Sequence, residues 1–196
     1  VKVVIYTSLV RSAIQRKKTA TKLELAQMTT LTTVTVGTIL NEFVASGEVS
    51  PGNLIPSQGG RPSRQYIYNE NFTKVCVIFA SYEQGIPSIS LRVVNQAHEI
   101  LHTETIQIAQ PLIFDFFLLL DKAVKVVPDI KAIGFALPGV VYQDRMSSDY
   151  HHLNGEDFLE TFRQRYSIPV FFENMVNAAC FGYCHRQPEK MPESVL

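Results

Sequence analysis

Residues 168–179 read Ile-Pro-Val-Phe-Phe-Glu-Asn-Met-Val-Asn-Ala-Ala, and this stretch decides the fold that we predict. Its part 169–172 is a short apolar run, which is typical of a buried strand. Apolar residues at helical spacing follow from 176 to 184, so a helix begins almost directly after the strand. A strand that leads straight into a helix is typical of an α/β domain.

The segments upstream of this stretch extend the same pattern. Residues 130–137 form an apolar run, broken only by Lys131 and Gly134, that ends at Pro138-Gly139, as expected of a strand followed by a turn. We predict, in chain order, strands at 75–80, 88–94 and 99–108, a helix at 111–127, a strand at 130–137 and a helix at 157–166. Three strands followed by alternating helices and strands predict a mixed sheet covered by helices over residues 71–196.

The first seventy residues have helical periodicity instead. Three short helices are predicted, at 3–16, 22–28 and 33–46. Thr21 and Glu24 form a capping-box pattern at the start of the second helix. The tight turn between the second and third helices is typical of a helix-turn-helix, and a three-helix bundle without a ligand is the alternative.

Two strands are predicted after the third helix, at 48–55 and 64–68. The residues between them, 56–62, are rich in Gly and Pro and carry Arg61. A basic tip of this composition suits an approach to a phosphate backbone or a minor groove. The hairpin therefore favours DNA binding over a bundle without a ligand.

The charge distribution agrees with a polyanionic partner for the first part of the chain. The whole chain is neutral, with 18 basic and 18 acidic residues. Residues 1–70 contain eight Lys and Arg against four Glu, a balance of +4, and the rest of the chain has a balance of −4. A basic front on an acidic body favours a polyanionic partner for the front, such as nucleic acid, and a solvated helical surface is the alternative.

Composition also narrows the class of protein. The longest apolar run, near residues 114–120, is interrupted by Asp115 and Asp121 and is far too short to span a membrane. Three cysteines at irregular spacing argue against a disulfide framework and suit a reducing compartment, so we expect a cytoplasmic protein. Cys180 and Cys184 are expected on the inner face of a helix as buried thiols, and no metal site is predicted in this portion.

Several motifs resemble the ROK (repressor, ORF, kinase) family of transcriptional regulators. They are residues 25–36, Gly59-Gly60-Arg61-Pro62, residues 134–139, Leu153-Asn154-Gly155 and residues 168–179. The resemblance implies an α/β chain with an N-terminal winged helix-turn-helix at 1–70. The first lobe of an actin-like/RNase H-like sugar kinase fold, cut short, would follow at 71–196. It also implies duplex DNA and a sugar or sugar derivative as partners, and a homodimer.

The helix-turn-helix and its resemblance to the family nominate the residues that would contact DNA. They are Lys22, Thr32, Thr33, Thr35, Thr38, Arg61 and Arg64. Arg61 is carried over first, because the family's Gly-Arg-Pro segment is associated with the minor groove. Two features depart from the family's pattern. Thr30 stands where the family usually has Gly, and the third helix has no Lys or Arg with which to read guanine.

The second part of the chain lacks two features that the resemblance requires of a kinase. Met175 stands where the family's kinases have the carboxylate that takes the proton from the sugar hydroxyl. Residues 80–85 lack the acid and the glycine pair of a phosphate-binding turn. We therefore predict no enzymatic activity, although Asp149 or Glu173 remains a conceivable substitute base.

Sugar binding is a separate expectation. The resemblance assigns Asn154 and Asn174 to sugar hydroxyls, and capping or turn chemistry is the alternative for both. No cofactor is expected in this portion, and the family's zinc site would lie beyond Leu196. The predicted function is a carbohydrate-responsive regulator, most simply a repressor. The alternatives are a sugar kinase with an N-terminal extension and a DNA-binding protein whose kinase-like half only dimerises.

Overall fold

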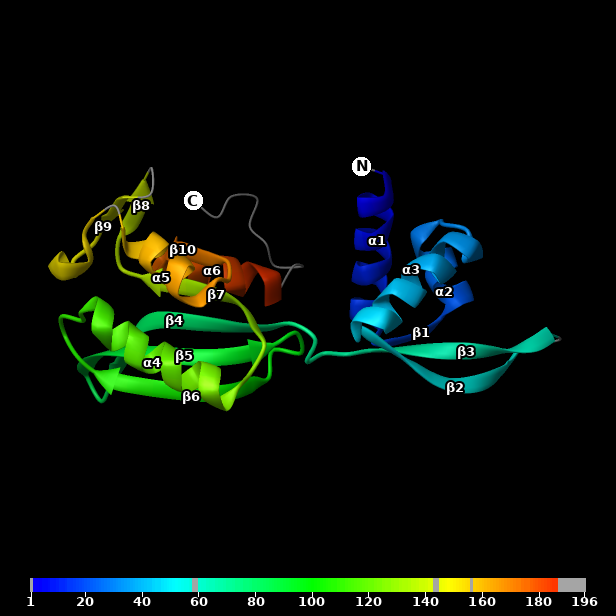
Figure 1. Ribbon diagram of the computed structural model, residues 1–196, viewed down its shortest axis with the longest axis horizontal. Coiled ribbons are helices and arrows are strands. Elements are labelled where there is room, and N and C mark those ends of the chain that lie inside the picture. The colour runs from blue at the N-terminus through cyan, green and yellow to red at the C-terminus, as the bar shows by residue number, and fades with distance from the viewer. Residues whose placement is uncertain (1, 58–59, 143–144, 156, 187–196) are drawn as a thin grey trace. The chain divides into compact units, whose positions relative to one another are not determined.

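The computed structural model describes residues 2–57, 60–142, 145–155 and 157–186 (Figure 1). The chain divides into two compact units, Val1–Phe72 and Thr73–Leu196, each with its own apolar core. Within the described ranges, no helix combines the length and the apolar character that crossing a membrane requires.

The first unit consists of three helices and a small antiparallel sheet. The helices are α1 (Lys2–Lys17), α2 (Lys22–Thr29) and α3 (Thr33–Ser46), and all three were predicted. The strands are β1 (Thr19–Thr21), β2 (Val49–Ser57) and β3 (Gly60–Tyr68), in the order β1-β3-β2. β1 was not predicted, because three residues give no periodicity to detect.

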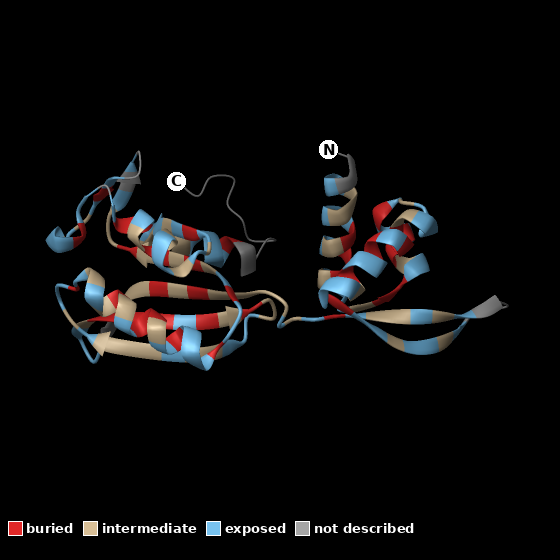
Figure 2. Cartoon of the chain, in the orientation of Figure 1, coloured by how far each residue is buried: buried red, intermediate tan, exposed pale blue. Residues whose placement is uncertain are grey.

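The core of the first unit comes from one face of each helix. Val10 and Ile14 of α1, Leu25 of α2, and Val36 and Leu40 of α3 are all fully buried. Figure 2 shows buried positions recurring between exposed ones along these helices, which is the pattern of an amphipathic helix.

The β2–β3 hairpin is longer than predicted. Residues 56–62 were expected to form a loop, but the strands continue through Pro56 and Pro62 and pair as far as Ser57 with Gly60. β2 is an edge strand, and β1 pairs with β3 only opposite residues 65–67. A proline on an unpartnered edge removes no ladder hydrogen bond, so both prolines are tolerated. Residues 58–59 lie outside the described part.

The second unit is built on a five-stranded mixed sheet in the order β10-β7-β4-β5-β6. The strands are β4 (Lys74–Glu83), β5 (Ile86–Asn95), β6 (Ile100–Gln107), β7 (Ile130–Leu137) and β10 (Val170–Asn174). β4, β5 and β6 are antiparallel, and β4, β7 and β10 run parallel to one another. The predicted mixed sheet and its strand order along the chain are confirmed.

Helices α4 (Ile113–Val126) and α5 (Phe158–Tyr166) pack on this sheet, and α6 (Met175–Arg186) contacts β7 and β10. The core centres on Phe116 of α4. Its ring meets those of Phe135, Phe158 and Phe162 edge-on, with centroids 5.8, 6.0 and 6.3 Å away. The sheet and the two helices are therefore locked by one aromatic cluster.

Three details of the second unit differ from the prediction. α4 begins at Ile113 after an N-cap at Leu112, so Pro111 precedes the helix. The segment between β7 and α5 contains the hairpin β8 (Val140–Tyr142) and β9 (Arg145–Ser147) and the turn η1 (His151–Leu153). Cys184 is buried as expected, but Cys180 is exposed. Residues four apart share a helix face, so the core covers this face of α6 at Cys184 but not one turn earlier at Cys180.

Candidate nucleic-acid interface and ligand cleft

The N-terminal half of α3 presents a neutral surface of hydroxyl and methyl groups. Thr32, Thr33 and Thr38 are exposed and Thr35 is half-buried, while Val34 is 78% exposed. Thr32 caps the helix, with its Oγ1 accepting a hydrogen bond from the Thr35 amide at 3.2 Å. The hydroxyls of Thr32 and Thr35 lie 3.0 Å apart, and Thr38 donates to the Val34 carbonyl at 3.3 Å.

The turn before α3 is left-handed at a threonine. Thr30 has φ 56° and ψ 25°, the conformation in which a glycine is normally favoured. A β-branched residue is strained there. The neighbouring buried Thr29 donates to the Leu25 carbonyl at 2.6 Å, which ties the turn to α2. The turn therefore keeps the left-handed conformation that glycine favours, although the residue at this position is Thr30.

Much of the positive charge of the first unit is neutralised within the unit. Lys17 pairs with Glu24, Lys18 with Glu70, and Arg11 with Glu48. The Lys17 ammonium and the Thr21 amide hold the pKa of Glu24 at about 2, well below its ordinary value. Among the basic side chains that the structure describes here, those without an ion pair are Arg16, Lys22 and Arg64.

The ion pair of Arg11 and Glu48 joins α1 to the start of the hairpin. Glu48 is 2% exposed, and it accepts from Arg11 Nε at 2.6 Å and Nη2 at 3.0 Å. The Arg11 guanidinium also lies 4.9 Å from the centre of the Phe43 ring. The buried carboxylate raises the pKa of Arg11, so this cation serves the fold and is not available to a ligand.

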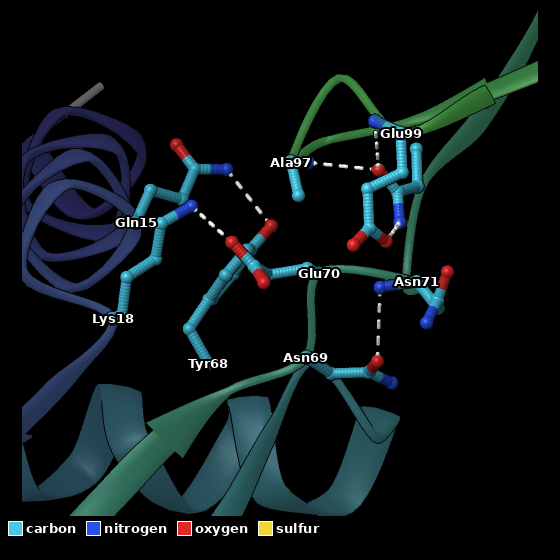
Figure 3. Close-up of polar contacts among 9 residues, drawn as sticks. Gln15, Lys18, Tyr68, Asn69, Glu70, Asn71, Ala97 and Glu99 are labelled. Carbon is cyan, nitrogen blue, oxygen red and sulfur yellow. Dashed lines mark hydrogen bonds and ion pairs between the residues drawn. The ribbon is translucent and has the colours of Figure 1, made fainter.

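The end of the hairpin is held by a second set of polar contacts (Figure 3). Gln15 Nε2 donates to the Tyr68 hydroxyl at 3.0 Å, and Lys18 pairs with Glu70. Burial raises the pKa of the Tyr68 hydroxyl. Asn69 accepts from the Asn71 amide at 3.1 Å.

In the second unit, the buried Asn95 accepts from the amides of Ala97 and Glu99 at 3.0 Å and so shapes the β5–β6 turn.

The remaining predicted DNA contacts lie on two neighbouring elements. Lys22 is the first residue of α2 and follows Thr21, which pairs with Gln65 of β3. Arg64, the next residue along β3, is exposed and lies opposite Leu54 of β2. The topology therefore brings the start of α2 to the middle of the hairpin. Arg61 also lies in β3, with its side chain outside the described part.

The second unit has a cleft of about 400 Å³ at the carboxyl ends of its parallel strands. Its lining comes from the ends of β4 and β7, the start of β5, two loops and the first residue of α6. The lining residues are Ala80, Ser81, Pro87, Ala109, Gln110, Pro138, Asp149, Tyr150 and Met175. Ligands of open α/β sheets bind at this end of the strands.

Asn154 and Asn174 flank the loops of this cleft without lining it. Asn154 accepts from the Ser148 amide at 2.7 Å and donates to the Ser148 carbonyl at 3.1 Å. Asn174 donates to the Gly139 carbonyl at 3.0 Å and accepts from the Val176 amide at 2.8 Å. Both side-chain amides are therefore occupied by backbone groups. Asn174 is bonded to the start of the segment 139–148 and Asn154 to its end.

The acids near Met175 differ in their availability. Asp149 is exposed and lines the cleft beside Met175. Glu173 does not line it, and its carboxylate accepts from the Asn174 amide at 2.8 Å and from Asn177 Nδ2 at 3.1 Å. Of the two acids raised by the sequence, only Asp149 therefore lies in the cleft.

Sequence reasoning missed Ser81 as a cleft residue, together with the hydroxyls behind it. Ser81 Oγ lies 2.8 Å from Ser90 Oγ, and Ser90 Oγ lies 2.9 Å from Thr105 Oγ1, a polar row across β4, β5 and β6. Alternation along each strand could have placed these residues on one face, but not their register across strands. Within the described ranges, no group of three or more His, Cys, Asp or Glu could hold a metal ion.

Comparison with solved structures supplies the context for both units. A ROK family transcriptional regulator, a homologue of the Escherichia coli Mlc protein, superposes with a TM-score of 0.64 at 14% identity. The match covers 86% of this chain. The chain has the fold of a ROK family transcriptional regulator. It spans 44% of the length of that ROK regulator.

Two further ROK family proteins match a smaller share of this chain. One is from Streptococcus pneumoniae in complex with sucrose, at 22% identity, 59% of this chain, 39% of that chain and a TM-score of 0.46. The other is a glucokinase from Streptomyces griseus in complex with glucose and AMPPNP, at 25% identity, 57% of this chain, 36% of that chain and a TM-score of 0.42. No protein-family model and no curated protein matches the sequence.

Proposed function

We propose that this chain is part of a DNA-binding transcriptional regulator whose second unit senses a sugar and lacks kinase activity. The observation that carries the proposal is the extent of the match to the ROK regulator. The unit Thr73–Leu196 makes up less than two thirds of the chain, so a match over 86% includes much of the first unit as well. Both units thus have counterparts in a protein described as a transcriptional regulator.

In this proposal the first unit is a winged helix-turn-helix. α2 and α3, joined by the left-handed turn at Thr30, form the helix-turn-helix, and β2–β3 forms the wing. α3 would enter the major groove with Thr32, Thr33, Thr35 and Thr38, while Lys22, Arg61 and Arg64 would contact phosphates or the minor groove.

The free cations support this division of roles. Lys22 and Arg64 have no ion pair. Lys22 lies on α2, the helix before α3, and Arg64 lies on strand β3 of the hairpin. α3 itself has Glu42 as its single charged residue. Affinity would therefore come from phosphate contacts outside α3, and sequence preference from uncharged side chains on it.

The second unit would act as the sensor. The cleft at the ends of the parallel strands suits a small polar ligand, and Met175, which the resemblance assigns to the position of a kinase's base, lines it. A sugar bound there changes DNA affinity only if it binds one conformation or dimer arrangement better than another. Asn154 and Asn174 are proposed to shape this cleft and to reach the ligand after it binds.

The test is a titration of fluorescent duplex DNA with the chain at several salt concentrations. We expect binding that weakens steeply with salt, and a double variant K22A/R64A whose salt slope is smaller by about 2, one for each lost phosphate contact. Arg11→Ala is unsuitable as a control, because Arg11 holds the fold. Lys125→Ala, on α4 of the second unit, is the matched control and should leave the slope unchanged. Absence of salt-dependent binding would overturn the proposal.

A sugar kinase is the second candidate, and one observation favours it. Asp149 lines the cleft beside Met175, where a carboxylate is exposed to a bound ligand. Kinase activity predicts hexose-dependent release of ADP from ATP that Asp149→Asn abolishes. Equal, background release from the chain and the variant excludes a catalytic role for Asp149 and leaves the sensor.

A further inference from the structure

We propose that Gly37 is a positioning residue of the DNA interface, because its missing side chain leaves the space in which the Lys22 ammonium lies across the middle of α3. Lys22 would thereby give the recognition surface the cation that α3 itself does not contain. The inference rests on the proposed DNA-binding function and adds to it a device that sets where the cation lies.

The backbone does not require glycine at this position. Gly37 is buried in the interior of α3 and, unlike Gly47 at the C-cap with φ 79°, it has no positive φ. A glycine inside a helix is less favourable than alanine, since glycine loses more backbone conformational entropy when the helix forms. The reason for a glycine at 37 therefore lies in what surrounds it.

The surrounding group is the end of the Lys22 side chain. A Cβ at position 37 would lie 2.9 Å from Lys22 Nζ, 3.2 Å from Cε and 3.5 Å from Cδ. The first two distances are too short for the lysine to stay where it is. Because the crowded atoms are the free end of a flexible side chain and not backbone, an alanine would fit by moving the ammonium.

The position of Lys22 suits a ligand contact better than a structural one. Lys17 and Lys18, just upstream in the same unit, each pair with a glutamate, whereas Lys22 is exposed and has no ion pair. Nothing acidic among the described contacts explains why the ammonium lies against α3. An unpaired cation held at one place is pre-organised for a phosphate.

The exposed α3 residues beside Gly37 include Thr33, which belongs to the proposed interface. Residues three and four apart are neighbours on a helix surface, so Thr33, Val34 and Asn41 surround Gly37, and all three are exposed. The ammonium therefore lies next to the groups proposed to read bases. A shift of this cation would change a phosphate contact without touching those groups.

The proposal predicts opposite effects of Gly37→Ala on stability and on DNA binding. The helix gains an alanine, so the thermal midpoint should be unchanged or rise by about 2–4 °C. The displaced ammonium should weaken duplex binding several-fold and lower the salt slope by about 1. Gly182→Ala is the matched control, because Gly182 lies inside α6 with nothing within 4 Å of an added Cβ. It should raise stability and leave binding unchanged.

Lys22→Met and the double variant K22M/G37A complete the experiment. If the glycine acts through the lysine, the double variant binds no worse than K22M alone. A Gly37→Ala chain with wild-type affinity and slope, or losses that add in the double variant, would overturn the proposal. Failure of the proposed function is distinguishable, because then the wild-type chain itself shows no salt-dependent binding to duplex DNA.

A readout without DNA tests the packing itself. Reductive methylation followed by mass spectrometry measures how fast each lysine reacts. We expect Lys22 to react faster in Gly37→Ala than in the wild type, with Lys122 and Lys125 of the second unit as internal references. Equal rates at Lys22 would show that the two residues do not pack against each other and would overturn the inference even if DNA binding is real.

Discussion

The two units differ in which of their polar side chains are left for a ligand. In the first unit three of the four glutamates pair with Lys17, Lys18 and Arg11, and among the described side chains Arg16, Lys22 and Arg64 have no ion pair. In the second unit the amides nominated for a sugar, Asn154 and Asn174, are bonded to backbone, and other residues line the cleft. Residue type alone nominates a contact, but the hydrogen-bond partner decides whether the group is available.

The difference also concerns charge. The first unit has a formal excess of four cations, which its internal ion pairs leave unchanged, as expected of a surface that meets a polyanion. The cleft of the second unit is lined by neutral groups and the single carboxylate of Asp149. A cleft whose one charged lining residue is an acid suits an uncharged polar molecule better than a phosphorylated one.

The largest expected effect tests whether the units are separate folding units. Phe116→Ala removes the central ring of the aromatic cluster, which is fully buried against Phe135, Phe158 and Phe162. The free energy of unfolding of the second unit should fall by about 3–5 kcal/mol, because the substitution leaves a cavity. Hydrogen exchange should show lost protection in the second unit and unchanged protection in α1–α3. Equal loss in both units would contradict two independent cores.

The next effect concerns Arg11, a cation whose ion pair with Glu48 stabilises the first unit. Arg11→Met keeps the aliphatic stem but leaves the Glu48 carboxylate buried without its partner. The first unit should lose about 1–3 kcal/mol, less than for a fully buried pair, since Arg11 is partly exposed. Urea unfolding followed by circular dichroism measures the change. Replacing both residues, as in R11M/E48M, should recover part of the loss, and a double variant no better than Arg11→Met would argue against the buried charge as its cause.

The elements of the fold were predictable because they depend on local patterns. Periods of two and of 3.6 residues gave the strands of the mixed sheet and helices α1 to α6, and the capping box at Thr21 is present as predicted. The hairpin length was not predictable, because proline is acceptable in a strand only at the edge of a sheet or at a bulge. That depends on β1 pairing with part of β3, which no local pattern reveals.

The candidate sites were only partly predictable for the same reason. The placement of Met175 and Pro138 at one cleft follows from parallel strands, whose carboxyl ends meet at one edge. The bonding of Asn174 to Gly139 and of Arg11 to Glu48 joins residues 35 and 37 positions apart. Such contacts are set by tertiary packing, so the sequence could not separate ligand-binding groups from structural ones.

A smaller effect tests the turn between α2 and α3. Thr30→Gly should raise the stability of the first unit by about 0.5–1 kcal/mol, since glycine adopts the left-handed conformation of Thr30 without strain. Thermal unfolding of the chain measures the gain. Ala45→Gly on α3, where the backbone is helical, should instead destabilise by about 1 kcal/mol. A loss of stability in both variants would mean that the Thr30 hydroxyl and methyl contribute more than the turn costs.

The smallest effect separates structural charge from available charge. The pKa of Glu24 falls from 4.5 in the unfolded chain to about 2 in the folded chain, because Lys17 and the Thr21 amide stabilise the carboxylate. Its contribution is therefore complete above about pH 4.5 and is lost as the pH falls toward 2. Both partners are partly exposed, so solvent screening limits the contribution to about 0.3–0.5 kcal/mol.

Glu24→Gln keeps an acceptor for the Thr21 amide and removes only the charge. Acid titration of the first unit between pH 5 and 2 should then lose less stability than the wild type loses. Glu42→Gln, an exposed residue of α3 without an ion pair, should leave the acid profile unchanged. If both variants flatten the profile equally, the effect is one of net charge, and ion pairing no longer distinguishes Lys17 from Lys22, the cation proposed to contact DNA.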